Sequence, residues 1–431
     1  MPVSLPQRPA RPPARRRVRV PPAVTRGPET LAAAGILDEV RGDLGVLLWR
    51  SLRNVSLWTA TPEGRRAGLF AGGAADVREA EVRELAVEPE LVAPLSVLVR
   101  LLENPAGMDL ERVVNACRRV AGWAEQRGAL ATALEYTQAA ALAVPESAAL
   151  AYAVGRLARR RAEYDRAESW YTRAIVQSRR AGDWQSYARA FSGLGNLFVQ
   201  KGNFPAAARA HRRCLRSARR HCLRELGGDA LHDLFVLAFE TRDGENPEGY
   251  ARAALAAYGP GHRKLPRLAY DIAYYWTLEG RFGPALRVVS AILPHMGDME
   301  ERMVVWGAIA RAAGGMGDAR RYRSAAEETW RMAGTETATD AAARALLGVA
   351  HGAASLGEWD EAERALQGAL GYATERQESK IRLTAEAMLD FVHTRRRTQL
   401  APAAAAEESE SLAADLIRAL APLAGESAVL V

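Results

Sequence analysis

Cysteine and lysine are scarce in this chain, and the scarcity of cysteine excludes a framework of disulfide bonds. The three cysteines, Cys117, Cys214 and Cys222, are too few and too oddly numbered for a disulfide framework. A reducing, cytoplasmic compartment therefore fits the sequence best. Lysine occurs only three times against 55 arginines. We interpret this bias as genome composition first and as phosphate recognition second.

Long apolar runs are also missing. No stretch of about 18 apolar residues occurs, so the sequence predicts no membrane-spanning helix. The N-terminus is positively charged, but no apolar segment comes after it as in a secretory signal. Eight prolines within residues 1–28 prevent the amphipathic helix of a transit peptide.

Acidic residues are absent from residues 1–28, which hold seven arginines. The remaining 51 basic side chains balance the 51 acidic ones, so the net charge of +7 comes from this segment. Proline and arginine leave little apolar surface to bury. We therefore expect residues 1–28 to be a disordered basic arm and the rest of the chain to be near neutral.

Alanine, leucine, arginine and glutamate dominate the remainder, a composition that favours helix throughout. Apolar residues recur at helical spacing in Leu31–Trp58, and further helices are expected at 75–87 and 90–102. We assign residues 29–108 to an N-terminal helical region without a detectable repeat. This region is a separate module or an extension of the helical block after residue 108, and the lack of a long linker favours the extension.

From about residue 110 the chain becomes periodic, with a small residue recurring every 34 to 43 residues. These anchor positions are Ala121, Gly155, Gly195, Asp233, Ala273, Gly307 and Ala350. Small residues let two antiparallel helices approach closely. A glycine followed two residues later by an aromatic residue recurs between the paired helices, at Gly202-Asn203-Phe204, Gly280-Arg281-Phe282 and Gly357-Glu358-Trp359. The glycine is expected to end the first helix and the aromatic residue to start the packing of the second.

In this frame the chain resembles the tetratricopeptide-repeat family. The resemblance covers about two thirds of the chain and implies an all-α, right-handed α-solenoid of helical hairpins. We place about seven repeat units in residues 109–397, with a degenerate one near 226–257 and a capping helix at 378–397. Residues 398–431 are expected to be a mobile tail rich in alanine and glutamate, in which Leu412, Leu416, Ile417 and Leu420 are spaced for a short amphipathic helix.

The resemblance also implies a concave groove lined by the first helix of each unit. Its predicted lining consists of Arg118, Tyr152, Arg156, Arg159, Arg160, Arg189, Asn196, Arg267, Tyr270, Tyr274, Arg344 and His351. Arginines and tyrosines in a groove suit an acidic peptide or a C-terminal carboxylate. Only Asn196 matches in type the family's known carboxylate clamp. The alternative is that these arginines pair with neighbouring glutamate and aspartate.

No residue constellation predicts catalysis, a cofactor or a metal. His211, Cys214, His221 and Cys222 lie close in sequence, but His211 and Cys214 occupy packing positions, so core packing is the expectation. The basic loop 259–264 is rich in glycine and is more typical of a turn between repeats than of an anion site.

We therefore expect a cytoplasmic interaction scaffold, not an enzyme, that binds an acidic protein or peptide in its groove. The acidic tail is a candidate occupant of the same groove. The alternative is a signal-sensing regulator that contacts nucleic acid through the basic arm and the helix at Arg209–Arg224, which holds seven arginines and no acidic residue. A solvated outer face is the plainer interpretation of that helix.

Overall fold

The computed structural model describes residues 20, 34–84, 88–241, 246–334, 341–375, 378–394 and 407–423. The expected basic arm, apart from residue 20, lies outside the described residues. Two compact units, Met1–Leu226 and Gly227–Val431, make up the chain, and each is described by itself. All regular structure in the described residues is helical, as predicted.

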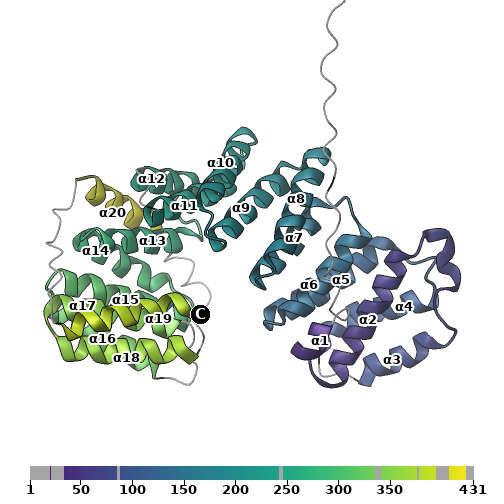
Figure 1. Ribbon diagram of the computed structural model, residues 1–431. Coiled ribbons are helices and arrows are strands. Elements are labelled where there is room, and N and C mark those ends of the chain that lie inside the picture. The colour runs from purple at the N-terminus through teal and green to yellow at the C-terminus, as the bar shows by residue number, and fades with distance from the viewer. Residues whose placement is uncertain are drawn as a thin grey trace, which may run out of the picture. The chain divides into compact units, whose positions relative to one another are not determined.

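Unit 1 consists of ten α-helices and a short 3₁₀ segment (Figure 1). They are α1 (Ala34–Glu39), α2 (Gly42–Ala60), η1 (Glu63–Gly68), α3 (Ala74–Glu84), α4 (Pro89–Glu103), α5 (Leu110–Gln126), α6 (Leu130–Ala143), α7 (Ala148–Arg160), α8 (Tyr164–Ala181), α9 (Trp184–Gln200) and α10 (Phe204–Arg220). The single helix expected at Leu31–Trp58 is two helices, because Gly42 has a φ of +72° and separates α1 from α2.

The N-terminal helices of unit 1 pack on α6. Tyr136, fully buried, donates a hydrogen bond from its hydroxyl to the carbonyl of Leu48 at 2.8 Å. The carboxylate of Glu39 accepts hydrogen bonds from the backbone N–H groups of Ala131, at 2.7 Å, and Thr132, at 2.9 Å. The start of α6 is thus capped by a side chain from α1.

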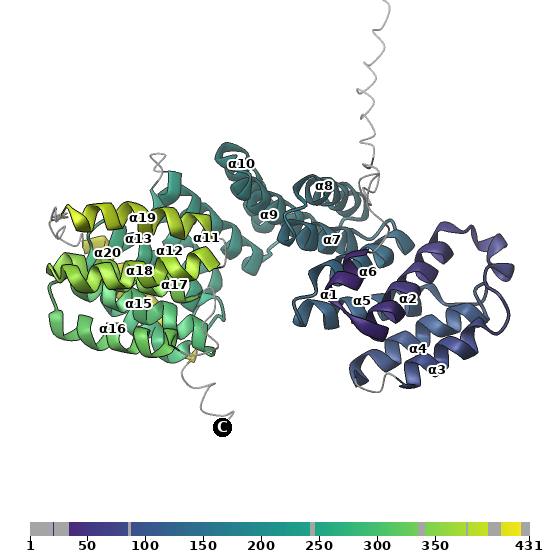
Figure 2. The same cartoon turned by 60° about the horizontal axis from the view of Figure 1, so that its bottom comes forward.

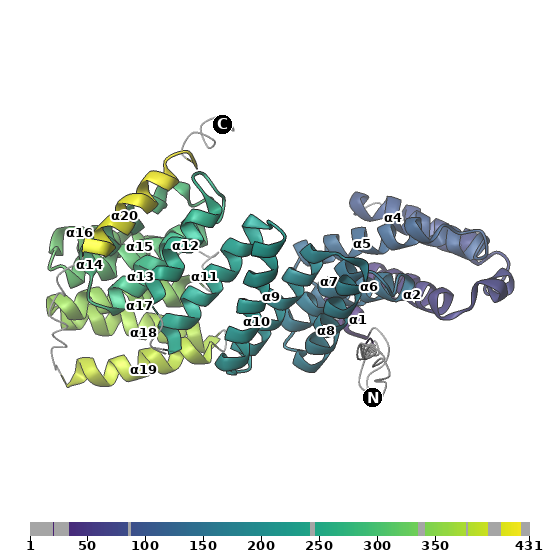
Figure 3. The same cartoon turned by 90° about the horizontal axis from the view of Figure 1, so that it is seen from above.

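The repeat hairpins of unit 1 are α5/α6, α7/α8 and α9/α10, in chain order (Figure 3). Gly155 on α7 faces the ring of Tyr171 on α8, where an added Cβ would lie 2.8 Å from the ring. Gly195 on α9 faces His211 on α10 in the same way, at 2.5 Å. The small residues at these anchor positions therefore let the paired helices approach closely, as the repeat pattern predicts.

Unit 2 begins within α11 (Arg224–Thr241) and contains the remaining helices. They are α12 (Pro247–Tyr258), α13 (Leu265–Leu278), α14 (Phe282–Ile292), η2 (Leu293–His295), α15 (Met299–Gly315), α16 (Ala319–Ala333), α17 (Ala341–Leu356), α18 (Trp359–Glu375), α19 (Ser379–His393) and α20 (Glu407–Leu420). The division between the units falls at the degenerate repeat, inside the block that we expected to be one array.

The predicted turns are present in both units. Gly202, Gly280 and Gly357 have φ values of +71°, +73° and +79°, and α10, α14 and α18 begin at the expected aromatic residues two positions later. At the far end of unit 2, α19 lies beside α18 (Figure 2), where we expected a capping helix.

Helices α15 and α17 pack with their backbones almost in contact. A Cβ added to Gly348 would lie 2.3 Å from the carbonyl oxygen of Gly307. One added to Gly314 would lie 2.3 Å from the carbonyl oxygen of Gly352. These four glycines form a seam that brings the first helices of two successive hairpins together.

The expectation of a mobile tail is wrong for residues 407–420, which form α20. Figures 1 and 3 show α20 beside α12 and α14, and the side chains of Leu412, Leu416 and Leu420 are buried. Burial of this apolar stripe explains why the segment is ordered. The rest of the expected tail, residues 398–406 and 424–431, lies outside the described residues.

Polar contacts also hold α20 in place. The carboxylate of buried Glu248 on α12 accepts hydrogen bonds from Trp276 at 2.9 Å, Arg281 at 2.5 Å and Ser409 of α20 at 3.0 Å. In the loop 259–264, the N–H of Gly261 donates to the carbonyl of Ala419 at 2.9 Å. This loop therefore acts as a turn that supports α20.

Candidate peptide-binding site

The predicted groove residues of unit 1 lie on α5, α7 and α9, and two of their arginines are already neutralised. Arg156 donates two hydrogen bonds to the carboxylate of Glu125, at 2.5 and 2.7 Å. Arg160 donates a third to the same carboxylate at 2.5 Å. The hydrogen bond from Arg156 is the main reason that the pKa of Glu125 lies below its usual value. Arg156 and Arg160 therefore pair with a neighbouring acid, which was the alternative to a role in peptide binding.

Arg159 belongs to a tyrosine cluster of unit 1. Tyr152 and Tyr171 have their ring centroids 5.9 Å apart. Burial raises the pKa of Tyr171 to about 12, and the nearby positive charge of Arg159 opposes that rise. Arg118 and Arg189 are exposed, Asn196 is half-buried, and neither arginine has an ion pair within the described part of the chain. Unit 1 therefore offers scattered positive charges at these positions.

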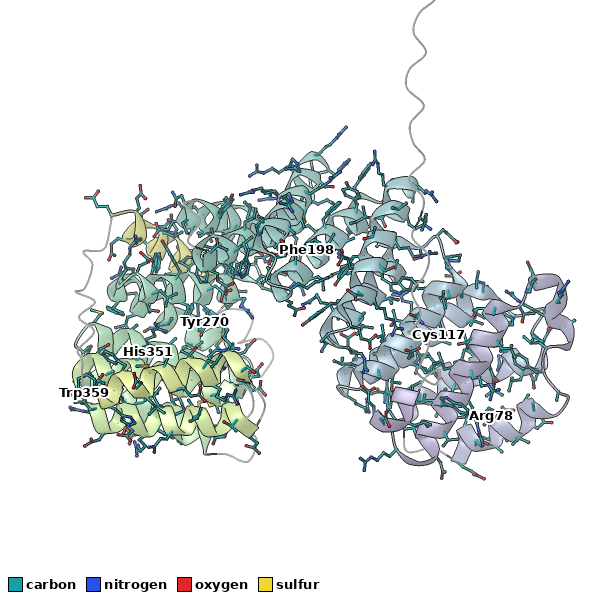
Figure 4. The ribbon with its side chains drawn as sticks, viewed as in Figure 1. Arg78, Cys117, Phe198, Tyr270, His351 and Trp359 are labelled. Carbon is teal, nitrogen blue, oxygen red and sulfur yellow. The ribbon has the colours of Figure 1, made fainter. Side chains whose placement is uncertain are left out.

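Unit 2 gathers its predicted residues more closely, around α13, α15 and α17. Tyr270 lies on α13 and His351 on α17, and both are labelled in Figure 4. Arg311 of α15, which is not among the predicted groove residues, lies close enough to both that its charge affects their pKa values. Its guanidinium lies over the ring of Tyr274, 5.4 Å from the centroid. The glycine seam makes this possible, because it holds α15 against α17.

Arg311 is half-buried and has no carboxylate partner among the described residues. Removal from water lowers the pKa of Arg311, and the phenols of Tyr274 and Tyr270 oppose that shift. Burial, followed by the charge of Arg311, holds the pKa of His351 well below its ordinary value. Partial removal of a guanidinium from water without a counter-ion carries a free-energy cost.

Tyr270 and Arg344 form the adjoining part of the site. Burial raises the pKa of Tyr270 to about 12, while the charge of Arg344 acts in the opposite direction. Both residues line a cavity of about 240 Å³ together with Asp271, Val304 and other side chains of unit 2. Arg344 is exposed and has no ion pair within the described residues.

Arg267 is compensated by an acid, unlike Arg311 and Arg344. Its Nε lies 3.2 Å from the carboxylate of Asp271, which also lies 2.8 Å from Nε2 of His232. On the same side Phe239 packs edge-on against Tyr274, with centroids 6.4 Å apart. The five residues Tyr270, Tyr274, Arg311, Arg344 and His351 thus form a cationic and aromatic cluster, which we call the unit 2 cluster.

The sequence does contain a signal from which Arg311 could have been predicted. It lies four residues after the anchor Gly307, as Arg159 lies four residues after the anchor Gly155. Applying the repeat frame to α15 would therefore have found it. His232 had no such signal, because the repeat unit around Asp233 is degenerate.

The residues considered for a metal do not gather. His211 and Cys214 are buried in the α9/α10 hairpin, and Cys222 is exposed. Among the described residues no group of three or more histidine, cysteine, aspartate or glutamate side chains is placed to hold a metal ion. Within the same residues, no helix has both the length and the hydropathy to cross a membrane.

A comparison with protein families matches residues 146–220, which hold α7 to α10, to the tetratricopeptide repeat. The chain contains tetratricopeptide repeats. Tetratricopeptide-repeat proteins generally mediate protein–protein interactions, and their fold is usually non-catalytic. The predicted family and all-α hairpin fold are therefore confirmed.

Solved structures are similar at low identity, and no curated protein matches the chain. PilF of Pseudomonas aeruginosa is 17% identical, with a TM-score of 0.41 over 52% of this chain and 95% of that one. BtubC from P. vanneervenii is 16% identical, with a TM-score of 0.39 over 52% and 90%. A signal-transduction ATPase with a tetratricopeptide-repeat sensor from Pyrococcus horikoshii is 12% identical, with a TM-score of 0.49 over 91% and 62%. These similarities carry no argument about the partner of this chain.

Proposed function

We propose that this protein is a non-catalytic interaction module whose unit 2 cluster binds an acidic peptide segment. The observation that supports the proposal most directly is Arg311, which is half-buried against Tyr274 and has no carboxylate partner among the described residues. A glutamate, aspartate or terminal carboxylate of a partner supplies the missing charge through a bidentate hydrogen bond.

The aromatic residues give this site more than charge. Tyr270 and Tyr274 lie beside Arg311 and Arg344, which have no ion pair within the described residues, and aromatic rings beside arginines are found where binding energy concentrates in protein interfaces. In unit 1, by contrast, Glu125 already occupies Arg156 and Arg160. We therefore place the acidic-peptide site in unit 2 and expect the corresponding arginines of unit 1 to contribute little.

The test uses the full chain and a fluorescein-labelled peptide of glutamate and leucine, with a glutamine-and-leucine peptide as the uncharged reference. Fluorescence anisotropy measures the affinity. Arg311→Met combined with Arg344→Gln should weaken binding of the acidic peptide by about 10- to 100-fold, because charge-assisted hydrogen bonds are lost. Methionine keeps an unbranched stem against Tyr274.

Arg302→Gln combined with Arg320→Gln is the matched control. Both arginines are exposed in unit 2, lack an ion pair within the described residues, and lie outside the cluster. This variant removes the same charge and should keep most of the affinity. Equal affinity for the two peptides, or equal loss in the two variants, would count against the proposed site.

A further inference from the structure

Helix α10 of unit 1 carries a row of arginines on the side opposite its packed face. Arg209, Arg213, Arg216 and Arg220 follow one another at intervals of four, three and four residues, so they share one stripe of the helix. All four are exposed. The stripe is about 16 Å long, since a helix rises about 1.5 Å per residue.

The opposite side of α10 explains how the stripe is oriented. Ala207, Ala210, His211, Cys214 and Ala218 are buried, and His211 packs against Gly195 of α9. The helix holds no acidic residue, and Arg219 adds a fifth exposed cation beside the stripe. Figure 4 shows long side chains that end in nitrogen projecting from the α10 ribbon.

The stripe lacks counter-charges within the described residues. None of its four arginines has an ion pair with a described carboxylate, and the guanidinium of Arg213 lies over the ring of Phe191, 5.2 Å from its centroid. Like charges four residues apart destabilise a helix. An arrangement that costs helix stability and leaves its charges unpaired fits a surface that an external polyanion covers.

We propose that this arginine stripe binds the phosphate backbone of duplex nucleic acid. A duplex carries about one charge per 1.7 Å of its axis, so a length equal to the stripe presents about ten phosphate charges. The guanidinium fork matches phosphate oxygens with paired hydrogen bonds. Contacts of this kind position a protein on a duplex without sequence selectivity.

An acidic protein is the poorer match to this surface. Protein interfaces depend on buried aromatic or aliphatic anchors, and the stripe has none between its arginines. Single strands are also disfavoured, because α10 carries no exposed aromatic ring between the arginines, and the ring of Phe191 on α9 is covered by Arg213. The stripe and the unit 2 cluster lie in different units and differ in chemistry, so this proposal does not depend on the peptide-binding proposal.

The experiment measures anisotropy of a fluorescent DNA duplex of about 20 base pairs with the full chain, between about 50 and about 200 mM salt. The variant changes Arg209, Arg213, Arg216 and Arg220 to glutamine. Each lost phosphate contact reduces the slope of log affinity against log salt by about 0.9, so we expect the slope to fall by about 3 to 4.

Two controls make the result specific. Changing Arg118, Arg119, Arg302 and Arg320 to glutamine gives the same net charge but leaves the stripe intact, and this variant should keep the original slope. Changing the four stripe arginines to lysine should also keep it. Circular dichroism melts of every variant confirm that the chain is folded.

Each other outcome overturns the proposal. An equal fall in slope for the two glutamine variants means that net charge or the N-terminal arm, rather than the stripe, binds DNA. A labelled poly-glutamate peptide that depends on the stripe more strongly than the duplex does identifies an acidic protein as the partner. Binding of the glutamate-leucine peptide in the unit 2 assay is measured separately, so failure of one proposal leaves the other standing.

Discussion

Two turns of unit 1, after α7 and after α10, hold a non-glycine residue at the left-handed position that glycine takes in the turns after α5, α8 and α9. Ala162 and Cys222 have φ values of +58° and +56°, in the left-handed region that Gly182 and Gly202 occupy at equivalent turns. A Cβ in this region clashes with the neighbouring carbonyl. The sequence did not mark these two turns, because the marker glycine is missing.

We expect Ala162→Gly and Cys222→Gly each to raise the free energy of unfolding by about 0.5–1 kcal/mol, since relief of strain exceeds the added entropy of the unfolded chain. Urea titration followed by circular dichroism measures this. The reverse change, Gly202→Ala, should lower the free energy of unfolding by about 1 kcal/mol. A destabilised Ala162→Gly variant would contradict the argument.

His351 makes stability depend on pH in a direction set by its environment. Burial and Arg311 hold its pKa well below the ordinary value of 6.5, so the folded protein favours the neutral ring. The unfolded chain takes up the proton as the pH falls below about 6.5. The contribution of neutral His351 is therefore fully present above that pH and is lost as the pH falls towards the folded pKa.

We predict that the wild-type chain loses more unfolding free energy between pH 7.5 and 5.5 than the His351→Gln variant does. The difference is at most about 1.4 kcal/mol per pH unit, the limit for one proton. Urea titrations of both proteins at the two pH values measure it. The contribution of the carboxylates to the change in unfolding free energy cancels in this comparison, because they titrate in both proteins. Equal losses of unfolding free energy in the two proteins would refute the prediction.

At the scale of the helices, the seam between α15 and α17 depends on the absence of side chains. Gly348→Val should lower the free energy of unfolding by about 2–4 kcal/mol, because a side chain at this position meets the backbone of Gly307. Gly371→Ala on α18 is the matched control, since nothing lies within 4 Å of its Cβ position. The control should be neutral or stabilising by up to about 1 kcal/mol, as alanine favours helix. Similar effects of the two changes on a thermal melt would disprove the role of the seam.

The hairpins were predictable because their signals are local. Paired small residues and the glycine–aromatic turns lie within one repeat, and the structure places them as expected, for example Gly155 against Tyr171. The ion pair of Arg156 with Glu125 spans 31 residues, close to one repeat, and a search for acids one repeat away would have found it. The position of α20 was not predictable, because it depends on contacts such as Ser409 with Glu248, 161 residues away.

At the scale of the whole molecule, most contacts join neighbouring helices, and α20 is an exception within unit 2. Repeat proteins respond to local damage locally, because each repeat is stabilised by its neighbours. The side-chain hydrogen bonds of α20 go to α12 and to the region of α14. Within the described residues, none of the hydrogen bonds of α20 involves the unit 2 cluster. The hypothesis that the tail occupies the groove therefore lacks support from α20.

Deletion of residues 395–431 tests in one variant whether α20 stabilises only its neighbouring helices and whether the tail blocks the groove. Loss of α20 exposes the surfaces of α13 and α14 on which it packs and removes its hydrogen bonds to α12, so amide hydrogen exchange should accelerate in α12 to α14 and stay unchanged in α5 to α8. Affinity for the glutamate-leucine peptide should also stay within about twofold, because no hydrogen bond of α20 within the described residues goes to a residue of the cluster. An affinity that rises tenfold or more would restore the self-inhibition hypothesis. Faster exchange throughout both units would instead mean that α20 supports the fold globally.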